Sequence, residues 1–464
     1  MNKIKPIVWK IAYDLGLIVM GIQILLGVCW LLQNLWLVPD FPQTVELLEM
    51  SETWVLDEYA GAAYVALVFV AQTLQNCLGI PFQIFLYVLQ LALGIWAVYR
   101  LLRYAFADHG EVFLKEKRGK LVLASLFVNT IPFLLQAHMA VLPYSLAGSM
   151  LFALLAELLS LIRWSGNDEC LGDKKGLAKK MTILIVLWCL SALIYPGHRM
   201  ISGAVVVLGV LCVGIGRKEL RGWLVIGVVL GALLGGLTLA VTSEEGSRNK
   251  IQNTLESQAM QRLAWPHLES MESVWPWDVV VAFSEEELGY VSVTPERVRD
   301  VFGPWMEEKF GKELANAYYG DMAVAALRYN TKAVLSQIGK DMCFYLCPQW
   351  STLQGLEGKG VSYTGQNYER LQESTPKLTQ VFVKWSGISF VVFCLMTIAC
   401  WRRNKMSGLW LGLVVFAWAT LVVSCTWTSG GMVDYLKSFA VMAIWGMLMT
   451  LWLWAGEERG ADSK

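Results

Sequence analysis

Ten segments of about 20 mostly apolar residues constrain what this chain can fold into. A helix needs about 20 such residues to cross the hydrocarbon core of a bilayer, because each residue advances it by only about 1.5 Å. The whole chain is 56% hydrophobic with a mean hydropathy of +0.48. A soluble globular protein carries less apolar content, so the sequence predicts an all-α polytopic membrane protein. The expected spans are residues 11–37, 81–102, 121–136, 140–162, 181–196, 200–216, 222–242, 383–401, 408–427 and 438–455.

Basic residues gather in every second connection between these segments. They lie in residues 100–120, 163–180, 217–221 and 402–405, whereas the short connections between them carry almost none. Cytoplasmic loops of membrane proteins are enriched in Lys and Arg, so this alternation predicts the cell membrane as location and cytoplasmic N- and C-termini. The first apolar stretch is long for a signal peptide and lacks a small-residue cleavage site, which favours an uncleaved first span.

Residues 59–79 are apolar at roughly helical spacing, yet they carry Gln72, Gln75 and Asn76. Counting them as an additional span would invert every later loop and destroy the charge pattern. We therefore expect an amphipathic juxtamembrane helix that lies along the outer surface.

Residues 243–382 form a long polar segment between the seventh and eighth spans, with 19 acidic against 13 basic side chains. A connection of this length is uncommon unless it is folded or functional. Thr294 and Pro295 offer a helix start, and helix-period apolar residues continue to about Leu346. We expect a mostly helical extracytoplasmic domain. The chain then divides into a seven-span module, 1–242, this outer domain, 243–382, and a three-span module, 383–464.

Asp57 and Glu58 form an acidic pair between the first span and the expected surface helix. On the outer side, a carboxylate next to a phosphate-binding cation could deprotonate an acceptor hydroxyl or amine. The pair could equally help to hold a divalent cation, the one cofactor that the sequence suggests. The alternative is a solvated loop with no chemical role.

Few cations are expected on the outer side, and these are candidate phosphate contacts. Arg199 follows His198 at a Pro-Gly hairpin, and Lys437 lies close to Asp434. A guanidinium binds phosphate through a bidentate fork, and an ammonium binds it as a point charge. His138, at the expected outer tip of the third and fourth spans, could donate to a headgroup. The alternatives are lipid contact, a local ion pair or an interfacial polar residue.

Several classes of function lack their sequence signals. No pair of histidines has metal-ligand spacing, so no metal-binding residues are assigned. No Walker loop or Rossmann glycine fingerprint occurs, which argues against nucleotide hydrolysis. The net charge is zero, and no nucleic-acid partner is expected.

The order of these features resembles the GT-C membrane glycosyltransferases, in particular the protein O-mannosyltransferase and lipid A aminoarabinose transferase branch. The resemblance rests on Asp57-Glu58 after the first span, the helix at 59–79, and the large outer segment after the seventh span. Many relatives carry a second acidic site between spans three and four, where this chain has Gln136-Ala137-His138.

The resemblance implies a glycosyltransferase of the cell envelope that moves a sugar from a polyprenyl phosphate to an extracytoplasmic glycan, lipid or protein acceptor. It implies that Asp57, with support from Glu58, acts at the acceptor. Two alternatives remain. An O-antigen polymerase or ligase would depend on outer Arg and His residues and not on Asp57, and a non-enzymatic transporter would need ionisable groups inside the membrane.

Overall fold

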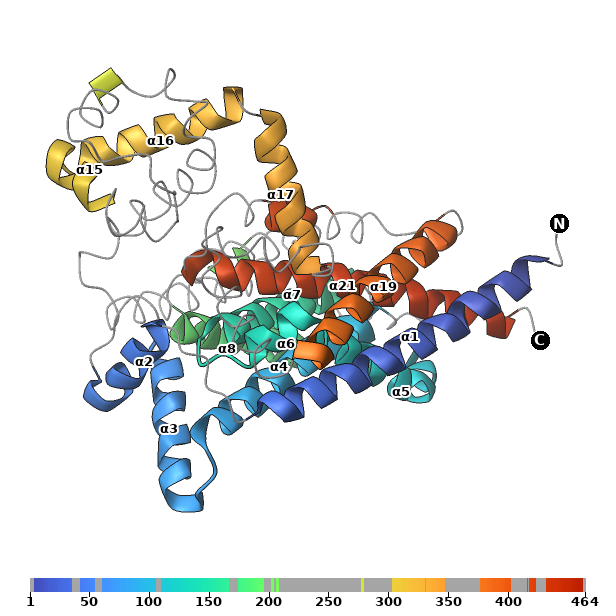
Figure 1. Cartoon of the computed structure of the whole chain (residues 1–464). Coiled ribbons are helices and arrows are strands. Elements are labelled where there is room, and N and C mark those ends of the chain that lie inside the picture. The colour runs from blue at the N-terminus through green and yellow to red at the C-terminus, as the bar shows by residue number, and fades with distance from the viewer. Residues whose placement is uncertain are drawn as a thin grey trace.

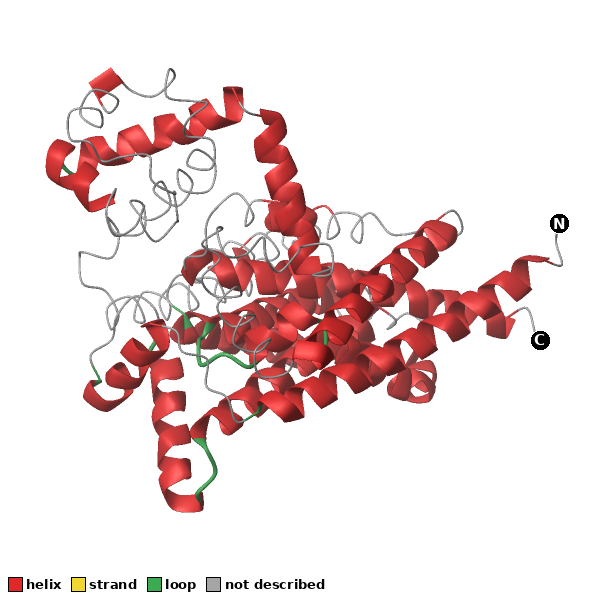
Figure 2. Cartoon of the chain, viewed as in Figure 1, coloured by secondary structure: helices red, strands yellow, loops and turns green. Residues whose placement is uncertain are grey.

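In the computed structural model every element of the described part of the chain is a helix, and no strand occurs there (Figure 2). The structure describes residues 4–35, 42–54, 61–105, 110–166, 174–195, 202–203, 206–207, 277–278, 303–329, 331–346, 376–401, 415, 417–422 and 431–461. The expected spans 200–216, 222–242 and 408–427 lie largely outside these residues.

Thirteen helices are bounded within the described residues (Figure 1). They are α1 (Ile4–Asn34), α2 (Pro42–Thr53), α3 (Ala62–Leu78), α4 (Phe82–Ala105), α5 (Gly110–Asn129), α6 (Pro132–His138), α7 (Tyr144–Gly166), α8 (Lys174–Ile194), α15 (Gly303–Phe310), α16 (Lys312–Tyr329), α17 (Thr331–Leu346), α19 (Pro376–Trp401) and α21 (Gly431–Ala461).

Four of these helices are long and apolar enough to cross a membrane: Tyr13–Asn34, Phe82–Tyr104, Tyr144–Leu161 and Gln380–Thr397. α1 also exposes a row of large apolar side chains, among them Ile18, Leu25 and Leu32, each about 60% exposed. A row of this kind is costly in water and suits contact with lipid. The apolar helices therefore indicate membrane association.

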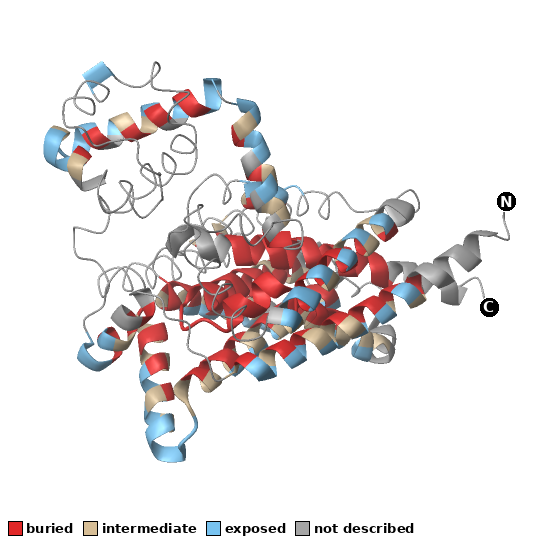
Figure 3. Cartoon of the chain, in the orientation of Figure 1, coloured by how far each residue is buried: buried red, intermediate tan, exposed pale blue. Residues whose placement is uncertain are grey.

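The first and last helices pack against each other. Tyr13 of α1 stacks on Trp452 of α21 with ring centroids 4.8 Å apart, and the Trp452 indole N–H donates to the Tyr13 carbonyl at 3.3 Å. α19 packs beside both helices, and its Phe393 contacts Phe127 of α5. Buried side chains concentrate in the middle of this bundle, while the far end of α3 is exposed (Figure 3). α1 starts and α21 ends at the same end of the bundle (Figure 1).

α3 is the helix that the sequence predicts at 59–79. It is apolar but only 17 residues long, and it runs across the long axes of α1 and α4 (Figure 1). It packs against α2, α4 and α8 through a buried face that includes Tyr64 and Val68. A helix along a membrane surface is expected to cross the spans in this way, and both the surface position of α3 and its placement on the outer side stay predictions.

The expected span 121–136 is broken. α5 ends at Asn129, and α6 begins at Pro132 in a direction that differs by 82°. Pro132 has no N–H to donate, and its ring disfavours helical backbone in the preceding residue. Ile131 is accordingly extended, with φ −63° and ψ 133°. All seven residues of α6 are buried, and the helix contacts α1, α4, α5, α7, α19 and α21.

α15, α16 and α17 are helices in the described part of the predicted outer segment. The helices end at Leu346, where the apolar periodicity predicts the end, while the predicted start at Thr294 lies outside the described residues. α16 runs beside α15, and α17 then leads back to the bundle and packs on α21 (Figure 1). The domain bounds stay predictions.

Candidate functional site

Two of the six predicted site residues, His138 and Lys437, lie in the described part of the chain. Asp57, Glu58, His198 and Arg199 lie outside it. The structure therefore describes one predicted cation and one predicted histidine, and it describes Trp54 and Gly61, the nearest described residues on either side of the acidic pair.

The residues on both sides of the acidic pair are fixed to the bundle. Trp54 ends α2 with a left-handed φ of 57°, and its N–H donates to Met50 O at 2.8 Å. Its ring lies 5.6 Å from the ring of Phe69 on α3. On the other side, the Gly61 N–H donates at 2.9 Å to Ile194 O, at the end of α8. Trp54 thus packs on α3, and Gly61 is hydrogen-bonded to the end of α8.

Lys437 lies where α21, α17 and α6 meet. Its side chain is only 2% exposed, and its ammonium nitrogen lies 5.1 Å from the ring centroid of Tyr345 on α17. The Tyr345 ring in turn meets Phe133 of α6 edge-on, with centroids 4.9 Å apart. An ammonium removed from water is costly unless anions or electron-rich groups surround it. This junction therefore holds a buried cation between α17 and the bundle.

His138 is buried at the end of α6 and bonds through both ring nitrogens. The Asn129 side-chain N–H donates to Ser125 O at 2.9 Å, so its Oδ1 accepts from His138 Nε2 at 2.9 Å. His138 Nδ1 then accepts from the Ser145 hydroxyl at 2.5 Å. The imidazole carries its proton on Nε2 in this arrangement, and it ties the ends of α5 and α6 to the start of α7. A direct bond from His138 to phosphate would require one of these two bonds to open.

Glutamine side chains hold both ends of α6, and the sequence reasoning missed them. Gln23 of α1 donates to Thr130 O at 3.0 Å, and Gln90 of α4 donates to Ala140 O at 2.9 Å. The side-chain carbonyl oxygens of Gln23, Gln90 and Gln136 are buried and accept no hydrogen bond from the described residues. A glutamine inside an apolar span is the signal that could have identified this polar interior.

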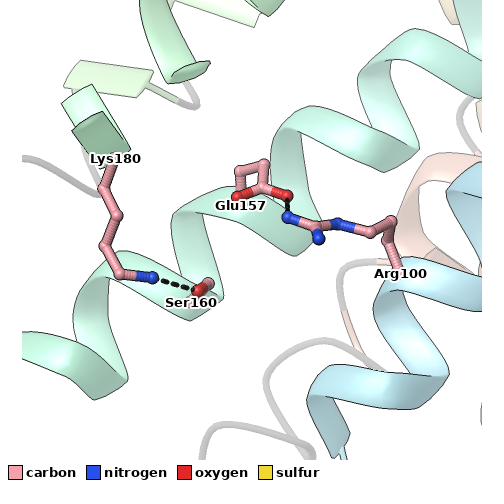
Figure 4. Close-up of polar contacts among 4 residues, drawn as sticks. All are labelled: Arg100, Glu157, Ser160 and Lys180. Atoms are coloured by element: carbon pink, nitrogen blue, oxygen red, sulfur yellow. Dashed lines mark hydrogen bonds and ion pairs between the residues drawn. The ribbon is translucent and has the colours of Figure 1, made fainter. Parts of the chain in front are cut away.

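A second polar cluster lies near the C-terminal ends of α4 and α7 (Figure 4). Arg100 of α4 pairs with Glu157 of α7, and the carboxylate is buried with 5% exposure. Lys180 of α8 donates to the Ser160 hydroxyl at 2.7 Å, almost one helical turn beyond Glu157. These contacts join three helices, and both partners of each contact are side chains of the protein itself. We interpret the cluster as structural.

Within the described ranges, no group of three His, Cys, Asp or Glu side chains is arranged to hold a metal ion. Asp57 and Glu58 lie outside these ranges. No family model, curated protein or solved structure matches the chain.

Proposed function

We propose that this protein is a membrane glycosyltransferase that moves a sugar from a polyprenyl phosphate to an acceptor on the outer side of the membrane. The observation that carries the proposal is the burial of Lys437 at the junction of α17 with the bundle. Lys437 places an ammonium group beside apolar helices, and a polyprenyl phosphate combines an anionic group with an apolar chain.

The reaction would proceed as an inverting displacement. The Asp57 carboxylate takes the proton of an acceptor hydroxyl, and the acceptor oxygen forms a bond to the anomeric carbon while the bond from that carbon to the lipid phosphate oxygen breaks. The phosphate leaves as an anion that Lys437 and Arg199 stabilise, with His198 beside Arg199 and Glu58 beside Asp57. Catalysis then consists mainly of positioning and electrostatic stabilisation. A contribution of His138 to phosphate binding stays a prediction.

The acidic pair is tested by the glycan profile of cells that carry Asp57→Asn at normal membrane abundance. We expect the transferred sugar to disappear, because an amide cannot take the acceptor proton. Glu52→Gln is the matched control, because Glu52 is an exposed carboxylate on α2 shortly before Asp57 in the sequence. Unchanged glycans in Asp57→Asn would rule out its role as the base.

The phosphate contact is tested separately by binding of farnesyl phosphate, a short polyprenyl monophosphate, to the purified protein. We expect Lys437→Met to lose most of the binding and Lys384→Met to retain it. Lys384 is an exposed lysine near the start of α19 and serves as the control. Equal binding by both variants would contradict the proposed role of Lys437.

The proposed orientation has its own test. A cysteine introduced at Asp300 should react with a membrane-impermeant maleimide added outside the cell, because both termini are proposed to be cytoplasmic and this segment extracytoplasmic. Labelling at this position only after the membrane is permeabilised would overturn the proposed orientation. It would also overturn the proposal that the acceptor lies on the outer side.

A transporter is the second candidate, and α6 is the observation that favours it. A short, turned helix inside a bundle, with glutamines at both ends, resembles the discontinuous helices that line transport sites. The pattern of variants separates the two functions. A transferase loses its product with Asp57→Asn and keeps it with Gln23→Met. A transporter keeps its cellular phenotype with Asp57→Asn and loses it with Gln23→Met.

A further inference from the structure

α3 has two apolar faces, of which one is buried in the protein and the other is largely exposed. The buried face consists of Tyr64, Val65, Val68 and Ala71. The second face consists of Val70, Leu74 and Leu78, which follow one another at intervals of four residues and therefore share one side of the helix. Val70 is 46% exposed and Leu78 is 64% exposed, while Leu74 is half-buried. The exposed end of the helix is visible in Figure 3.

Polar side chains occupy a different side of α3. Thr73 and Asn76 are three residues apart, and both are exposed. α3 contains no Asp, Glu, Lys or Arg. A helix with an exposed apolar face and a separate polar face suits the boundary between acyl chains and headgroups. Because α3 carries no charge, its attraction to such a boundary depends on apolar burial and not on the charge of the lipids.

The connection to α4 keeps the end of α3 close to a candidate span. α3 ends at Leu78, and the candidate span in α4 begins at Phe82. The Gly79 N–H donates to Gln75 O, and the Phe82 N–H donates to Gln75 Oε1, both at 2.8 Å, so Gln75 closes the turn. Four steps of chain span at most about 14 Å. If α4 crosses the bilayer, Leu78 lies close to the edge of its hydrocarbon core.

We propose that α3 rests on the bilayer with Val70, Leu74 and Leu78 among the acyl chains and with Thr73 and Asn76 among the headgroups. The partner of the exposed apolar face is the lipid of the leaflet in which α4 begins. The sequence predicts a surface helix without assigning its faces, and the pattern of exposure assigns them. This inference does not depend on the proposed sugar transfer.

The test measures the surroundings of each side of α3. A fluorescent amino acid is introduced by stop-codon suppression at position 70, 73, 74, 76 or 78 of the full-length protein, which leaves the native cysteines in place. The proteins are reconstituted into phosphatidylcholine vesicles. Fluorescence is quenched either by lipids brominated in the middle of their acyl chains or by iodide on both sides of the membrane. We expect the ratio of bromolipid to iodide quenching to be several-fold higher at positions 70, 74 and 78 than at positions 73 and 76.

Two exposed apolar residues provide the references. Val88 lies within the candidate span of α4, Leu335 lies on α17, and each is 58% exposed. A label at position 88 should be quenched by bromolipid, and one at position 335 by iodide. The alternation along α3 should persist when phosphatidylglycerol is added and when the salt concentration is raised, because no charge on α3 takes part.

Three results would overturn the proposal. Quenching by iodide alone at all five positions would place the apolar face in water. Quenching by bromolipid at all five positions would mean that α3 is immersed in the bilayer instead of lying on it. Protection of positions 70, 74 and 78 from both quenchers would mean that another protein or a second copy of this chain covers the face. Since three positions report on one side and two on the other, a single variant that fails to fold leaves the comparison intact.

Discussion

Gly61 permits a contact that no other residue could make. A Cβ at this position would lie 2.0 Å from the carbonyl oxygen and 2.6 Å from the carbonyl carbon of Leu193. Both are backbone atoms at the end of α8, so a change of rotamer cannot make room. The backbone of Gly61, at φ −81° and ψ 161°, is itself acceptable to alanine, so the whole effect of Gly61→Ala comes from this contact.

The expected cost of Gly61→Ala follows from two contributions. Overpacking costs about 1–3 kcal/mol. Moving α3 away from α8 also lengthens the hydrogen bond from Gly61 N–H to Ile194 O, now 2.9 Å, which contributes about 1 kcal/mol. We therefore expect a loss of about 2–4 kcal/mol in the free energy of unfolding. Because Gly61 closely follows Asp57 and Glu58, we also expect reduced sugar transfer.

The assay is a denaturant titration of the detergent-purified protein, with glycan analysis of the same variants in cells. Gly21→Ala on α1 is the control, because no atom lies within 4 Å of a Cβ there. It should be neutral or stabilise by up to about 1 kcal/mol, since alanine favours helix over glycine. A Gly61→Ala protein that unfolds at the same denaturant concentration as the Gly21→Ala protein would refute the reasoning.

Two further predictions concern the interior of the bundle. Gly94→Ala places a Cβ 2.3 Å from Asn129 Oδ1 and should lower the denaturation midpoint, whereas Gly446→Ala, with its closest contact at 3.5 Å, should leave it nearly unchanged. Equal denaturation midpoints for the Gly94→Ala and Gly446→Ala proteins would argue against a rigid polar network around Asn129. Arg100→Leu should destabilise by about 1–3 kcal/mol by leaving the buried Glu157 carboxylate without its partner, and adding Glu157→Leu should restore most of the loss. A double variant as unstable as the single one would contradict this account of the pair.

The helices with long apolar runs could be predicted from the sequence, because span length and composition depend on local residues alone. α1, α4, α7 and α19 lie where four expected spans lie. The break before Pro132 could not be predicted with equal certainty. A proline ends or kinks a helix in water, yet spans tolerate it when neighbouring groups satisfy the freed backbone. Here Gln23, distant in sequence, donates to the carbonyl of Thr130.

The surroundings of His138 and Lys437 also could not be predicted from local sequence. The sequence favours the outer tip of a hairpin for His138, and the 82° turn places it instead among buried side chains. Lys437 stands out in the sequence as a cation near the outer end of a span. Its contact with Tyr345 depends on how α17 docks on α21, which no local pattern encodes.

The enclosure of α6 also has a consequence for synthesis. Its surroundings include α19 and α21, which leave the ribosome only after most of the chain has been made. Until then, the residues from Pro132 to His138 lack two of their covering helices, although Gln23 and Gln90, which are made earlier, can already bond the backbone at both ends of α6. We therefore expect α6 to become fully covered only after α19 and α21 have packed on it. A chain truncated before Gly431 should be recognised as incomplete and degraded.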